Sequence, residues 1–286
     1  MSIKMTLDPQ IARQFINIIG AIVDEFRLRI NKDGWKVSAM DPAKVVLIDI
    51  DLPKDNFQSY EFGSDNWTSS IDGHPTGVLE DNIAVGIDVD KFKEFFGGMG
   101  KKAEIVLHEE LHAPVEFIFS MAPAKYYGKY QVELKQGMFT RKMLLLLETE
   151  IRKAPKIPEL RLDYEIQLDT LEFQRILIKA EKISDYISLG FRREEGGITF
   201  IASAIDSDEF PWDATKQLHN WHALSDKARD SSCSLFSLDY LIDIVEVLSS
   251  DKVWLHIGQD FPCTILFGLG KSGTVKYWQA PRIESE

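Results

Sequence analysis

The chain has 286 residues, of which 44% are apolar and 11% aromatic, and its 33 basic and 45 acidic side chains give a formal net charge of −12. This composition excludes an intrinsically disordered protein, and the length favours two domains over a single hydrophobic core. The acidic balance argues against a protein that wraps nucleic acid around its whole outer surface, but it leaves room for a local basic strip.

The chain begins MSIKMTLDPQ, without the positive-then-apolar pattern of a secretory signal. No stretch approaches the roughly 20 apolar residues that a membrane-spanning helix needs. Cys233 and Cys263 are too few for a disulfide framework or for a zinc site built from thiolates. We therefore expect a soluble protein in a reducing, intracellular compartment.

The first half of the chain alternates between predicted helices and strands. Residues 8–23 begin with a capping aspartate and a proline, and their apolar side chains recur at helical spacing, so we predict a helix there. Alternating strands follow over 25–51, and a long surface loop over 65–81. A strand then leads into a second short helix that ends at the glycines near 97–100, and further strands follow up to residue 148.

Residues 147–162 interrupt this pattern with charges of mixed sign and two prolines, which predicts an extended connector. The series then repeats, with a helix over 168–184, a hairpin, a loop-like insertion over 210–231, a second short helix over 238–249 and three strands. The sequence therefore predicts an α+β duplication, in which each domain has two helices packed on antiparallel sheets. Its predicted parts are an N-terminal domain at 1–146, a connecting loop at 147–162 and a C-terminal domain at 163–286.

One pattern in the sequence is typical of a zinc hydrolase. His108, Glu109 and His112 fit HExxH, in which two histidines one helical turn apart hold zinc and the glutamate acts as general base. That chemistry requires a helix, but the motif follows an alternating strand and precedes a proline, so a charged hairpin tip is favoured and the hydrolase is the remote alternative. His219 and His222 are interpreted as surface or packing residues. Because the sequence contains no phosphate-binding loop or nucleophile motif, we expect no enzyme activity, cofactor or metal site.

Basic side chains occupy polar positions of three predicted helices, and the helix over 238–249 has none. In an acidic protein they are readily explained as ordinary solvated helix faces. Their equivalent places in a repeat raise the alternative of a basic lining that faces a phosphate backbone, whose contacts would be independent of nucleotide sequence and sensitive to salt. These candidate DNA-facing residues are Arg13, Lys91, Lys93, Arg175, Lys179 and Lys182.

Four segments together resemble the replicative DNA sliding clamp, the proliferating cell nuclear antigen family of archaea and eukaryotes. They are SAMDPAKVVLIDIDLP at 38–53, PKIPEL at 155–160, SLDYLIDIVEVLSSDKVWLHIGQDFPCTILFGL at 237–269 and KYWQAPRIESE at 276–286. The resemblance implies the DNA clamp fold in a two-domain, non-enzymatic subunit. It also implies a head-to-tail homotrimeric ring with helices around a central hole, through which double-stranded DNA passes. The location would then be the cytoplasm of an archaeon, or the nucleus in a eukaryote.

The resemblance also implies a docking surface at the connector. Replicative DNA polymerase, flap endonuclease, DNA ligase and the clamp loader would bind there through short peptides with an apolar residue and two aromatic residues. An apolar groove beside an extended segment suits such anchors. Trp278 stands where the family usually has a smaller aromatic residue, so partner preference is expected to differ somewhat. The implied pocket residues are Met40, Lys44, Val45, Leu47, Pro155, Ile157, Pro158, Pro262, Trp278, Ala280 and Pro281.

Ring closure would pair two exposed strand edges from neighbouring subunits. From the resemblance we expect an edge near 142–147 to meet one near 198–204. The scarcity of basic residues on the helices departs from the family pattern and implies a weaker attraction to DNA. The two insertions mark an alternative, a specialised clamp paralogue that assembles only in a heterotrimer. The expected interface residues are Lys142, Leu144, Leu146, Ile198, Phe200 and Ala202.

Overall fold

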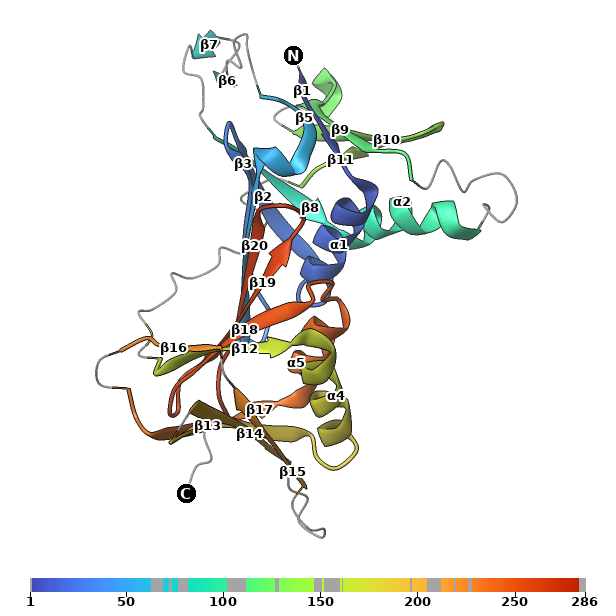
Figure 1. Ribbon diagram of the computed structural model, residues 1–286. Helices are drawn as coiled ribbons and strands as arrows, with labels where there is room; N and C mark the ends of the chain where they lie inside the picture. The colour runs from blue at the N-terminus through green and yellow to red at the C-terminus, as the bar shows by residue number, and fades with distance from the viewer. Residues whose placement is uncertain are drawn as a thin grey trace. The chain divides into compact units, whose positions relative to one another are not determined.

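The computed structural model describes residues 2–62, 69–71, 74–76, 82–101, 112–126, 129–146, 151, 160, 162–195, 197–204, 212–218, 220–225 and 228–282. The chain forms two compact units, the first from residues 1–39, 49–153 and 269–274 and the second from 40–48, 154–268 and 275–286. Residues 40–48, from the predicted N-terminal domain, thus belong to the second unit. Residues 269–274, from the predicted C-terminal domain, belong to the first. Among the described residues each unit contains two helices and antiparallel strands (Figure 1), so the predicted α+β class is confirmed.

Two groups of antiparallel strands build the first unit. A five-stranded sheet has the order β11-β10-β9-β1-β5, and in the second group β2 lies between β3 and β8. The strands of the N-terminal half are β1 (Ser2–Leu7), β2 (Glu25–Asn31), β3 (Gly34–Met40), β4 (Val46–Pro53), β5 (Phe57–Glu61), β6 (Ser69–Ile71), β7 (His74–Thr76), β8 (Asn82–Asp88), β9 (Val115–Met121), β10 (Tyr130–Gln136) and β11 (Phe139–Leu144). Short 3-10 turns occupy Lys54–Asn56 and Ala124–Tyr126.

The two helices of the first unit lie side by side (Figure 1) and are α1 (Pro9–Gly20) and α2 (Val89–Lys101). Helix α1 begins as the sequence predicts, because the carboxylate of Asp8 accepts a hydrogen bond from the backbone N–H of Gln10 at 2.8 Å. Gly20 allows α2 to approach closely, since a Cβ at this position would lie 2.7 Å from Cγ1 of Val89, the first residue of α2. The pair is thus fixed by local capping and by a close helix contact.

Aromatic side chains fill the core of the first unit around Trp35, which is almost completely buried. Its ring centroid lies 5.6 Å from that of Phe15 on α1, 5.0 Å from that of Phe57 and 5.0 Å from that of Phe117. These spacings suit edge-to-face aromatic packing. The core therefore joins α1 to strands that are distant in sequence.

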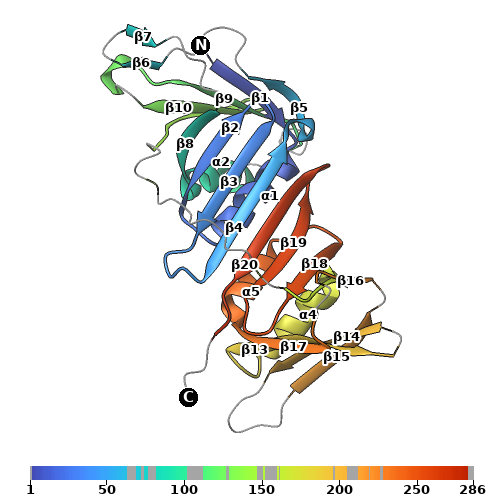
Figure 2. The ribbon, with the colours of Figure 1, turned by 90° about the vertical axis from the view of Figure 1, so that its left-hand side faces the viewer.

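The second unit repeats this plan with helices α4 (Thr170–Glu181) and α5 (Leu238–Glu246), which lie side by side (Figure 1). Asp169 caps α4 as Asp8 caps α1, with its carboxylate accepting from the N–H of Glu172 at 3.1 Å. One sheet of the unit has the order β15-β14-β13-β17 (Figure 2), and a second group of strands has the order β16-β12-β18-β19. The strands are β12 (Tyr164–Asp169), β13 (Tyr186–Glu194), β14 (Gly197–Ala204), β15 (Trp212–Leu218), β16 (Trp221–Ala223), β17 (Ser231–Ser237), β18 (Lys252–Ile257), β19 (Cys263–Leu269) and β20 (Gly273–Gln279).

The structure corrects the prediction that β14 is a free edge. β14 pairs with β13 on one side and with β15 on the other, so the four-stranded sheet ends at β15. Ile198, Phe200 and Ala202, the residues predicted to lie at a subunit interface, are fully buried within the unit. The error arose because residues 210–231, interpreted as a loop, contain β15 and β16.

Candidate functional site

A tightly hydrogen-bonded turn presents the first group of predicted docking residues. Asp41 is buried, and its carboxylate accepts from the N–H of Ala43 at 2.9 Å and from the N–H of Val46 at 2.6 Å. Lys44 adopts a left-handed backbone conformation with φ of 63° and exposes its side chain. The turn is therefore held by Asp41, a residue that was not among the predicted site residues.

The segment after β20 joins this turn directly. The N–H of Ala280 donates to the carbonyl of Val45 at 2.8 Å, which brings the predicted residues of 40–47 and 278–281 together in the second unit. Leu47 is buried, and the other described docking residues, Met40, Lys44, Val45, Pro262, Trp278, Ala280 and Pro281, are partly or fully exposed. Pro155, Ile157 and Pro158 lie outside the described residues.

A buried polar network lies on the inner side of β20, the strand that carries Trp278. Gln279 has no exposed surface; its Nε2 donates to the carbonyl of Ser237 at 2.8 Å and its Oε1 accepts from the hydroxyl of Tyr277 at 2.8 Å. The Tyr277 hydroxyl also lies 3.0 Å from the carbonyl of Tyr240 on α5, and burial raises the pKa of Tyr277 well above its usual value. This network fixes the segment that carries Trp278 to the start of α5. One feature of the sequence indicates this network: in the alternating strand over 273–279, the polar residue Gln279 falls on the same side as the apolar residues.

We expect Gln279→Leu to destabilise the protein by about 1–3 kcal/mol, because it leaves the partly buried carbonyl of Ser237 without its hydrogen-bond donor, although the Tyr277 hydroxyl keeps the Tyr240 carbonyl as an acceptor. Chemical denaturation of the full chain measures this loss. Lys276→Leu, an exposed position on the same strand, is the matched control and should change the free energy of unfolding by less than about 0.5 kcal/mol. Equal stabilities for Gln279→Leu and the native chain would show that the network contributes nothing.

The predicted DNA-facing residues differ in how they are engaged. On α2, Nζ of Lys91 pairs with the Asp88 carboxylate at 2.8 Å and Nζ of Lys93 donates to the carbonyl of Gly20 at 3.2 Å. Arg13 on α1 is partly exposed. On α4 and its C-terminal cap, Arg175, Lys179 and Lys182 are all exposed. Helix α4 therefore carries the main described concentration of exposed positive charge among the four helices.

Helix α5 has the opposite charge on its exposed side. Asp239, Asp243 and Glu246 are exposed along it, and the helix contains no basic residue. Partial burial, followed by the negative charges of Asp239 and Glu246, raises the pKa of Asp243. The two neighbouring helices of the second unit thus present opposite charges.

The five-stranded sheet of the first unit ends at β11, which bears the predicted interface residues. Leu144 is 40% exposed although it is a large apolar residue, and Nζ of Lys142 pairs with the Glu133 carboxylate at 3.1 Å. Leu146, just beyond β11, forms a bridge with Gly86. Among the described strands, β11 is therefore an exposed edge with an apolar side chain, and β15 is an edge of the four-stranded sheet.

The histidine candidates do not form a described metal centre. His112 lies in a turn, and His108, Glu109 and His219 lie outside the described residues. His222 stacks on Trp254 with ring centroids 5.9 Å apart. Within the described part of the chain, no group of three or more histidine, cysteine, aspartate or glutamate side chains could hold a metal ion. The same residues include no helix long and apolar enough to cross a membrane.

His256 gives the second unit a pH-dependent element. Its Nε2 lies 2.6 Å from the Glu165 carboxylate, and burial lowers the pKa of His256 below 6.5 despite that partner. The unfolded chain then binds more protons than the folded chain just below pH 6.5, so this histidine should reduce stability as the pH falls through that range.

We expect His256→Gln to show a smaller loss of Tm than the native chain between about pH 7.5 and about pH 5.5 in calorimetry. If the variant and the native chain lose the same amount of Tm, His256 does not cause the loss of stability at low pH.

Similar proteins and solved structures match this chain along 99% of its length, although family models do not. A scan against models of protein families gives no match. The DNA polymerase sliding clamp of Methanococcoides burtonii is 31% identical over 99% of this chain and 99% of its own length, and that of Methanocella arvoryzae is 30% identical over the same shares. The solved structure of Archaeoglobus fulgidus PCNA with the C-terminal region of FEN-1 has a TM-score of 0.76 and 25% identity, covering 99% of this chain and 100% of that one. The chain therefore belongs to the family of DNA polymerase sliding clamps.

Proposed function

We propose that this sliding clamp, a non-enzymatic processivity factor of DNA replication, closes as a ring of three identical subunits around duplex DNA and tethers partner proteins at one docking surface. The observation that carries the proposal is the match to sliding clamps along 99% of the chain. The A. fulgidus PCNA that it resembles binds the C-terminal region of FEN-1. A flap endonuclease is therefore the first partner proposed, followed by replicative DNA polymerase, DNA ligase and the clamp loader.

The proposed docking surface combines the turn held by Asp41, the segment 278–281 and the connector. The hydrogen bond between Ala280 and Val45 supports it, because the turn and the C-terminal segment then form one continuous surface. Trp278 is partly exposed there and offers an aromatic platform to an incoming side chain. Pro155, Ile157 and Pro158 of the connector are proposed to complete this surface, which suits partner peptides with apolar and aromatic anchors.

For the ring, we propose that β11 of one subunit pairs with β15 of the next. Both are the outer strands of their sheets, and pairing them would remove two unpaired edges. A head-to-tail contact of this kind closes into a ring when the rotation between subunits is right. The exposed Leu144 would then be covered by the neighbouring subunit.

Leu144→Glu is expected to shift the protein from trimers to monomers at micromolar concentration, because it places a charge where an apolar side chain would be buried. Light scattering coupled to size-exclusion chromatography measures the shift. Leu171→Glu on α4, another exposed leucine, is the matched control and should stay trimeric. If both variants keep the native mass, β11 is not the interface.

The acidic face of α5 favours a second candidate, a specialised paralogue that forms a ring only with other clamp subunits. In such a ring the positive charge required around DNA would be supplied partly by those subunits. The isolated chain would then fail to form homotrimers, whereas the first candidate forms them unaided.

A further inference from the structure

A cavity lies beside the connector in the second unit, at a place that the docking prediction does not include. Its volume is about 650 Å³. Four of its lining side chains are apolar and two are charged: Leu160, Leu162, Leu224 and Phe261, with Asp163 and Arg229. This lining suits a ligand that combines an apolar body with one charged group.

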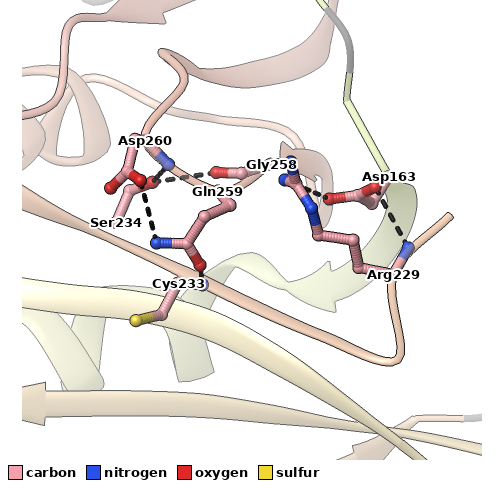
Figure 3. Close-up of polar contacts among 7 residues, drawn as sticks. All are labelled: Asp163, Arg229, Cys233, Ser234, Gly258, Gln259 and Asp260. Carbon is pink, nitrogen blue, oxygen red and sulfur yellow. Dashed lines mark hydrogen bonds and ion pairs between the residues drawn. The ribbon is translucent and has the colours of Figure 1, made fainter.

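The two charged residues are arranged so that only one is available to a ligand. The Asp163 side chain is 9% exposed, its Oδ1 accepts from the N–H of Arg229 at 3.2 Å, and its Oδ2 lies 3.7 Å from Nη1 of Arg229 (Figure 3). Oδ2 is enclosed and has no hydrogen-bond donor among the residues that the structure describes, so a ligand cation cannot reach it. The Arg229 side chain is 52% exposed, and Asp163 is its one ion-pair partner among the described residues, so its planar array of N–H donors suits a ligand carboxylate.

The wall of the cavity that carries Phe261 is held in place by hydrogen bonds. The hydroxyl of Ser234 donates to the carbonyl of Gly258 at 2.8 Å and accepts from the N–H of Asp260 at 2.9 Å (Figure 3). Gln259 adds a bond from the N–H of Cys233 to its Oε1 at 3.1 Å. A preformed wall lowers the ordering cost of binding.

We propose that this cavity is a second anchor site for partner peptides, which takes an apolar side chain with a neighbouring carboxylate bound to Arg229. The proposal rests on the proposed docking function, because two lining residues of the cavity are close in the chain to proposed docking residues: Phe261 directly precedes Pro262, and Leu160 lies two residues after Pro158. We therefore place the flanking part of such a peptide, rather than its central anchors, in this cavity.

The test uses the full chain and fluorescent synthetic peptides in anisotropy titrations. The core peptide carries one apolar and two aromatic anchors, and extended versions add Leu-Glu or Leu-Lys at either end. We expect the Leu-Glu extension at one end to bind about threefold to tenfold more tightly than the Leu-Lys extension at that end, because the partly exposed Arg229 attracts the glutamate carboxylate and repels the lysine ammonium group.

Variants assign the gain to the cavity. Arg229→Ala should abolish the preference for Leu-Glu, and Leu224→Ala, which leaves the Asp163–Arg229 pair intact, should reduce binding of both extended peptides toward that of the core peptide. Arg192→Ala, an exposed arginine on β13, is the control and should leave both effects unchanged. Unchanged affinity of the core peptide in each variant shows that the docking surface is intact.

The outcomes separate the two proposals. Core-peptide binding with equal affinities for Leu-Glu and Leu-Lys at both ends overturns the second anchor and leaves the docking function standing. The same holds if Arg229→Ala and Leu224→Ala keep the native preference. Failure of the core peptide to bind the native chain contradicts the docking function, and the second anchor falls with it.

Discussion

Alanine at both Ile157 and Trp278 is expected to weaken docking-peptide binding by about a hundredfold or more, because central aromatic and apolar anchors supply most of the energy of such interfaces. Trp278 is partly exposed on the outward side of β20, whereas Gln279 and Tyr277 point inward. Removing the indole therefore leaves the buried network that fixes this segment. Isothermal calorimetry with the core peptide measures the affinity.

The control for this variant is Leu171→Ala, which removes an exposed apolar side chain from α4 that is not one of the proposed docking residues. It should bind the peptide as the native chain does. The double variant should also keep the native trimer mass, since neither residue belongs to the proposed β11–β15 contact. Native affinity in the double variant would refute the assignment of these residues to the docking surface.

Glutamine at Arg175, Lys179 and Lys182 is expected to lower the affinity of the ring for duplex DNA by about tenfold or more at low salt. Each subunit loses three exposed positive charges from α4 and its cap. A plot of the logarithm of the binding constant against the logarithm of the salt concentration should also become less steep. Its slope should change by about 0.9 for each phosphate that the protein no longer neutralises. Anisotropy of labelled duplex DNA at several salt concentrations measures both quantities.

Two matched variants separate a local contact from a change in net charge. Glutamine at Lys32, Lys36 and Lys271, which are exposed and lie outside the helices, removes the same charge and should leave DNA affinity nearly unchanged. Asn at Asp239 and Asp243 with Gln at Glu246 should raise affinity by relieving repulsion from α5. Equal reductions in affinity from the α4 set and the Lys32 set would contradict a DNA-facing α4.

Features encoded by neighbouring residues could be predicted from the sequence. The caps at Asp8 and Asp169 depend on a side chain and an N–H two or three residues away, and both are present. The duplication of helix and strand units follows from such local patterns, and so does the α+β class. The family assignment required only that four segments occur together in order.

Features that depend on distant contacts could not be predicted in the same way. The residues of β15, WDATKQL, lack a clear alternation of apolar and polar side chains, and only pairing with β14 defines them as an edge strand. Asp41 and Gln279 stabilise the proposed docking surface through bonds to backbone groups that the sequence does not identify. The Arg229–Asp163 pair joins residues 66 positions apart.

The solution mass of the isolated native chain tests the proposed ring most directly. Multi-angle light scattering at micromolar concentration should give three times the chain mass of 32.6 kDa. A single peak at 32.6 kDa over the same concentration range would contradict a self-sufficient ring and would leave the heterotrimer subunit as the remaining candidate.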